Sequence, residues 1–185
     1  MNFSDILSSG TVMFTGTLVG ALLIVMLHFF YLKNLSDLLK AIRAPNRKMK
    51  PAAVWWILLN AFGGLFKIPV YFLVYNHIEI AIGLIVLGYL VVVFVVVWHF
   101  RIVYRIADSI EAEYNSRNIP VEHRPGSRIG AFMAISGALT LLNEIPYTGV
   151  IGKLTTLVFI IGMIAYWVRT YKFKKEIQAM PSITG

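Results

Sequence analysis

Hydrophobic positions dominate the chain and gather in long runs separated by short polar segments. The clearest run covers residues 81–100, AIGLIVLGYLVVVFVVVWHF, and contains no charged residue. As a helix it would be about 30 Å long, which matches the hydrocarbon thickness of a bilayer. Its β-branched residues would still have to be helical in lipid, because only a helix there satisfies its own backbone groups. The pattern therefore predicts a transmembrane helix.

Five such runs predict an all-α fold, a polytopic transmembrane helical bundle that forms one domain over residues 1–185. The predicted spans cover residues 11–32, 51–75, 81–104, 129–145 and 150–168. The fourth is short for a span, so four spans plus a re-entrant hairpin is the alternative.

Several boundaries follow from the local pattern. Residues 34–43, NLSDLLKAIR, place leucines on one helical face and predict a surface helix or a continuation of the first span. Pro51 is a favourable first residue for the second span. Residues 76–80 predict a tight turn. The helix of the third span is expected to continue to about residue 117, and residues 118–128, with two prolines and a glycine, predict a loop.

The placement of charge predicts the orientation. The chain has 17 Lys and Arg against 9 Asp and Glu, a net charge of +8, yet only 14% of its residues are charged. The cations gather in the loops 33–50 and 105–128 and in the tail after residue 168, which makes these segments cytoplasmic and the N-terminus external. This distribution argues against nucleic-acid binding. The chain has no cysteine, which excludes disulfides, thiolate catalysis and Cys-based zinc sites.

Ionisable residues inside spans are candidates for function. Lys67 and Glu144 are predicted to lie at the same depth in the outer third of the membrane, with Lys153 close by. We interpret Lys67 and Glu144 as a candidate intramembrane polar pair; snorkelling of each side chain to the outer interface and a role in transport or catalysis are the alternatives.

Other polar residues give weaker indications. His28 and His99 lie near the inner ends of their spans without a carboxylate at ligand spacing, which favours interfacial histidines over a metal site. The acidic cluster Asp108, Glu111 and Glu113 lies on the predicted cytoplasmic helix and is expected to form surface ion pairs. No nucleotide-binding, zinc-protease or serine-hydrolase motif occurs, so no catalytic, cofactor or metal residues are predicted.

Small residues mark candidate helix-packing faces. Gly16 and Gly20 form a GxxxG motif in the first span, and Gly130 begins a stripe of small residues in the fourth. Such faces permit close approach of helices, within one chain or between copies.

Three segments carry a family resemblance. NRKMKPAAVWW (46–56), RIADSIEAEYNSRNI (105–119) and IAYWVRTYKFKKEI (164–177) are together similar to small uncharacterised multi-span bacterial membrane proteins. The resemblance covers under a third of the chain. It implies a bacterial cytoplasmic membrane and no activity or site residues.

These observations predict a multi-pass protein of the cell membrane. We expect a non-enzymatic structural or accessory subunit without cofactors; a small transporter or channel that uses the polar residues around Lys67 and Glu144 is the alternative. The expected partners are the lipid bilayer, anionic lipid headgroups at the basic loop 33–50, and a protein partner or a second copy of the chain.

Overall fold

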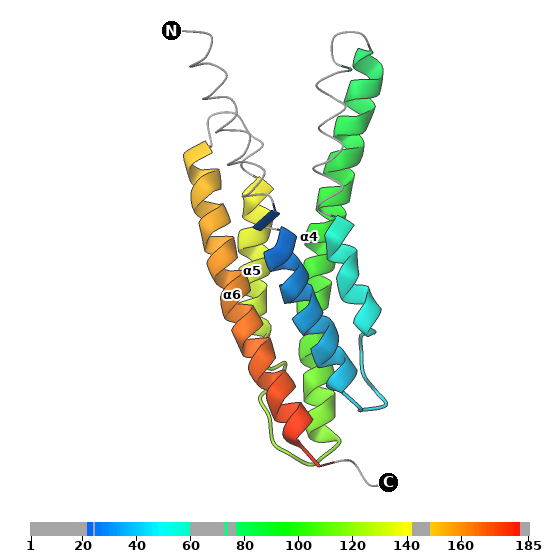
Figure 1. Ribbon diagram of the computed structural model, residues 1–185, viewed down its shortest axis with the longest axis vertical. Coiled ribbons are helices and arrows are strands. Elements are labelled where there is room, and N and C mark those ends of the chain that lie inside the picture. The colour runs from blue at the N-terminus through cyan, green and yellow to red at the C-terminus, as the bar shows by residue number, and fades with distance from the viewer. Residues whose placement is uncertain (1–21, 24, 60–72, 74–76, 142–148, 182–185) are drawn as a thin grey trace.

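The computed structural model describes residues 22–23, 25–59, 73, 77–141 and 149–181, and this part of the chain is helical without any strand (Figure 1). Its labelled elements are the 3-10 helix η1 (Pro51–Leu58) and the helices α4 (Ile78–Asn115), α5 (Ser127–Leu139) and α6 (Gly149–Ala179). A further helix is described over residues 22–23 and 25–41, and we call it the blue helix after its colour in Figure 1. The prediction of an all-α fold is confirmed for these residues.

The longest described helix, α4, has 38 residues and is unbroken. Its continuation past the apolar run is confirmed, since it ends at Asn115. A loop follows as predicted, but it covers residues 116–126 because α5 already begins at Ser127. The predicted turn over residues 76–80 is wrong in part, because α4 already begins at Ile78. In a helix the backbone groups of this uncharged stretch are satisfied internally, and no residue there forces a break.

Residues 34–41 continue the blue helix and do not form a separate surface helix. Leu35, Leu38 and Leu39 are fully buried. They recur every three to four residues, so they form one stripe, and that stripe packs into the bundle core.

The second predicted span begins at Pro51 as expected, but residues 51–58 form a 3-10 helix. It lies against α4, where the indole Nε1 of Trp98 donates a 2.9 Å hydrogen bond to the carbonyl of Ala53. Trp56 is exposed, and the guanidinium of Arg101 lies 5.2 Å from the ring of Trp98.

The short helix α5 packs against both α4 and α6. Gly130 makes this possible: a Cβ at this position would lie 2.8 Å from Cε2 of Tyr166 and closer still to Val103. Ala134, one turn later, is buried as well. The small-residue stripe therefore serves packing within the chain.

Two of the described helices are long and apolar enough to cross a membrane: α4 and α6, the latter over Val150–Ala179. At 13 residues, α5 is too short to do so by its described length alone. The number of spans therefore stays a prediction.

Burial is uneven along the bundle. The apolar half of α4 is mostly exposed, with Leu90 and Val97 each 62% exposed, whereas its second half contains Ile102, Ile106 and Ile110, all fully or almost fully buried. We call the lower end in Figure 1, where the 42–50 loop, the 116–126 loop and the end of α6 meet, the basic end. On α4, the fully buried apolar side chains therefore lie towards this end.

Candidate functional site

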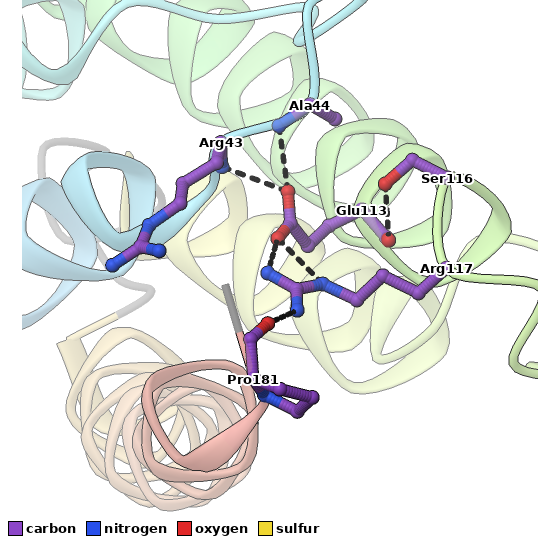
Figure 2. A network of polar contacts seen from close by, with 6 residues as sticks. All are labelled: Arg43, Ala44, Glu113, Ser116, Arg117 and Pro181. Atoms are coloured by element: carbon purple, nitrogen blue, oxygen red, sulfur yellow. Dashed lines mark hydrogen bonds and ion pairs between the residues drawn. The ribbon is translucent and has the colours of Figure 1, made fainter. Parts of the chain in front are cut away.

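The most unusual group at the basic end is the carboxylate of Glu113, whose side chain has no exposed surface. Its Oε2 accepts hydrogen bonds from the backbone N–H groups of Arg43 (2.7 Å) and Ala44 (2.6 Å), just after the blue helix ends (Figure 2). Only the backbone of Arg43 takes part, and its guanidinium points away from the carboxylate. Glu113 therefore fixes the start of the basic loop onto α4.

The charge of Glu113 is balanced by Arg117, one turn further along α4. Nε and Nη2 of Arg117 lie 3.0 Å and 2.6 Å from Oε1 of Glu113, and the arginine side chain is only 7% exposed. The remaining guanidinium nitrogen, Nη1, donates to the carbonyl of Pro181, the last described residue after α6. Two guanidinium nitrogens thus donate to one carboxylate oxygen, and this ion pair joins the basic loop, α4 and the end of α6 in one network.

A second attachment lies one turn before Glu113. Oγ of Ser109 accepts a 3.1 Å hydrogen bond from the backbone N–H of Lys48 and donates a 2.6 Å bond to the carbonyl of Arg105. Nη1 of Arg47 also donates to the carbonyl of Leu39, 3.2 Å away. Both ends of the 43–48 segment are therefore held by buried side chains of one helix face.

This fixed loop surrounds a hollow of about 630 Å³, which we call the basic hollow. Its lining comes from the loop itself and consists of Ile42, Arg43, Ala44, Pro45, Arg47, Lys48, Met49 and Lys50. The lining holds four cations and no carboxylate. Among the described residues, no ion pair joins these four side chains to an acidic group. The basic hollow can therefore attract an anion.

The other acidic residues of α4 form an exposed cluster with the 116–126 loop. Oε1 of Glu111 lies 3.0 Å from Nδ1 of His123, and its Oε2 accepts from the backbone N–H of Arg124. Nε of Arg124 lies 2.8 Å from Oδ1 of Asp108. The hydrogen bond from the Arg124 backbone, with a further one from His123, holds the pKa of Glu111 below its ordinary value.

The predicted surface ion pairs are thus present for Asp108 and Glu111. Glu113 also forms an ion pair, with Arg117, but its predicted place at the surface is wrong because the carboxylate is buried. In the part of the chain that the structure describes, no group of three or more His, Cys, Asp or Glu side chains is arranged to hold a metal ion.

Tyr114 joins α4 to α6 beside this site. Its hydroxyl donates a 2.5 Å hydrogen bond to Oε2 of Glu176, and its ring lies edge-on to Phe173. Burial, together with the Glu176 carboxylate, raises the pKa of Tyr114 above its ordinary value. The hydroxyl therefore stays protonated and acts as a donor.

The two histidines of the sequence analysis lie in one aromatic cluster. The rings of His28 and His99 each lie 6.3 Å from the ring of Phe159. Nε2 of His99, which is buried, lies 3.5 Å from the hydroxyl of Tyr31. The Tyr31 hydroxyl also donates to Sδ of Met133, 3.5 Å away, so the described part of this cluster is an aromatic core with weak polar contacts.

Most of the other predicted site residues are not among those that the structure describes. Lys67, Glu144, Gly16 and Gly20 lie outside the described residues, so the intramembrane pair and the GxxxG face stay predictions. Lys153 is described; it lies near the start of α6 and is exposed.

Sequence reasoning missed the roles of Ser109 and Glu113. A signal for them exists in the spacing of the buried stripe on α4, which runs through residues 102, 106, 109 and 113. These positions follow the i, i+4, i+7, i+11 pattern of one helix face, so both polar residues share the buried face with Ile102 and Ile106.

Comparison of the chain with protein-family models, with curated proteins and with solved structures gave no match.

Proposed function

We propose that this chain is a multi-pass integral protein of a bacterial cytoplasmic membrane, with five spans and the basic end in the cytoplasm, and that it acts as a non-enzymatic structural or accessory subunit. The observation that carries the proposal is the change of character along α4. Its first half is apolar and mostly exposed, whereas its second half is packed into a core beside the 42–50 loop and its four cations. A bilayer covers the first half, and positive charge retains the second in the cytoplasm.

The accessory role is supported by how the basic end is built. Its buried polar groups are used to hold backbone segments together: Glu113 binds the 43–44 segment, and Ser109 binds the backbone of Lys48. Groups used in this way are not free to act as nucleophile or base. Such an end presents a rigid charged surface beyond the membrane. The transporter alternative rests on Lys67 and Glu144, which lie outside the described residues.

Reporter fusions test the membrane placement. Fusions after residues 45, 78, 120, 147 and 185 should report inside, outside, inside, outside and inside. An external reporter at residue 185 would contradict five spans and favour four. A chain that partitions into the soluble fraction would contradict the membrane placement altogether.

Purification from native membranes in mild detergent tests the accessory role. A protein partner should remain bound at a fixed ratio, and its retention should fall when the charges of the basic end are removed. A lone monomer after gentle extraction from cells that express the chain at native level would contradict the accessory role, without bearing on topology.

A further inference from the structure

The positive-inside rule accounts for the number of cations in the 33–50 loop but not for their arrangement. That rule depends on how many Lys and Arg residues flank a span, and a disordered loop satisfies it equally well. In this chain the loop backbone is instead fixed at residues 43, 44 and 48 by two buried side chains of α4. Fixing the loop also requires burial of the Glu113 carboxylate, which is costly without a partner such as Arg117.

The consequence of this fixation is a preformed cationic hollow. Because Glu113 binds backbone N–H groups and Arg117, it leaves the side-chain charges of the loop unneutralised. Four cations around one hollow repel one another, and an anion placed among them removes that repulsion. A loop that is ordered before the ligand arrives also loses less conformational entropy on binding.

We propose that the basic hollow is a binding site for a phosphate group, with Arg43, Arg47, Lys48 and Lys50 supplying the charge and with Ser109 and Glu113 positioning the loop. Arginine guanidinium groups bind phosphate oxygens in pairs, and lysine ammonium groups add point charge. Both kinds of cation line the hollow.

The distance of the basic hollow from the membrane is compatible with two sources of phosphate, a lipid headgroup and a soluble compound. Ser109, which binds the Lys48 backbone, lies eleven residues beyond Trp98, or about 16 Å along the helix axis. Headgroups extend roughly 5–8 Å beyond the hydrocarbon on each side. A lipid phosphate would therefore meet Lys50 first, since Pro51 begins the helix that contacts Trp98, whereas a soluble phosphate compound would reach all four cations. The lipid source rests on the membrane placement proposed above; the phosphate site itself does not.

The experiment uses the full chain in a neutral detergent, with two kinds of probe. Inorganic phosphate and pyrophosphate are titrated by calorimetry, and phosphatidylglycerol is titrated by native mass spectrometry beside phosphatidylcholine as the uncharged comparison. The site variant carries Arg47→Gln and Lys48→Gln. The control variant carries Lys172→Gln and Lys175→Gln, which removes the same charge from exposed positions on α6.

We expect saturable binding of at least one probe, weakened tenfold or more in the site variant and less than twofold in the control. Binding confined to phosphatidylglycerol identifies a lipid site, and binding of the inorganic probes identifies a soluble ligand; either outcome supports the proposal. Absence of binding by all probes, or equal weakening in the two variants, would overturn it.

A second variant tests whether the loop must be held in place. Ser109→Ala keeps every charge of the hollow but removes the acceptor for the Lys48 N–H. We expect binding to weaken about three- to tenfold. Unchanged affinity would show that charge alone is sufficient and would overturn the positioning role of Ser109. Because binding is measured in detergent, a failed topology test leaves this result interpretable.

Discussion

Replacement of Glu113 by glutamine should be far more destabilising than the removal of one charge usually is. One carboxylate oxygen accepts two backbone hydrogen bonds and the other accepts two from the Arg117 guanidinium, and neither side chain is more than 7% exposed. Glutamine retains a single carbonyl oxygen. If that oxygen serves the backbone N–H groups, the amide NH₂ faces the guanidinium, donor against donor. Arg117 is then left as an unpaired buried cation.

Breaking a buried ion pair by removing one partner costs about 3–5 kcal/mol. For a chain of this size, 1 kcal/mol corresponds to a shift of about 2–4 °C in Tm. Glu113→Gln should therefore lower Tm by about 6–20 °C. The four tryptophans provide an intrinsic fluorescence signal for thermal unfolding in detergent.

The matched control is Glu111→Gln, the same substitution two residues away. Glu111 is 23% exposed and pairs with His123, which is 77% exposed, so the loss should be below about 1 kcal/mol. A double variant, Glu113→Gln with Arg117→Met, removes the orphaned charge and should recover part of the lost stability. If Glu113→Gln and Glu111→Gln unfold at the same temperature, the carboxylate is not buried and paired as described, and the reasoning fails.

Three further predictions concern packing, pH and the membrane interior. Gly130→Ala should lower the free energy of unfolding by about 1–3 kcal/mol because the added methyl group has no space. The control Gly83→Ala, where a Cβ would have nothing within 4 Å, should be neutral or slightly stabilising. Equal Tm values for the two variants would refute the close approach of the helices at Gly130. Because the folded-state pKa of Glu111 is depressed, its contribution to stability is present at neutral pH and is lost as the pH falls through that pKa. The Tm difference between wild type and Glu111→Gln should therefore vanish in acid. A Tm difference that grows in acid would contradict the depressed pKa. Lys67→Met and Glu144→Gln should each destabilise, with partial recovery in the double variant; a coupling energy near zero would exclude the pair.

Features that depend on local composition were readable from the sequence alone. Hydropathy gives the apolar length of residues 81–100, and the fixed φ of proline favours the helical start at Pro51. Two prolines and a glycine indicate the loop between α4 and α5. The clustering of cations at the basic end is likewise a property of the chain order, and the structure assembles those segments at one end of the bundle.

Which polar residues are buried was decided only by the tertiary structure. Asp108, Glu111 and Glu113 lie on the same helix with the same chemistry, yet only Glu113 points into the core, because its position falls on the face that packs against the end of the blue helix. Its partner Arg43 is 70 residues away in the chain. Local patterns carry no information about that separation, since hydrogen bonds between distant segments exist only once the helices have packed.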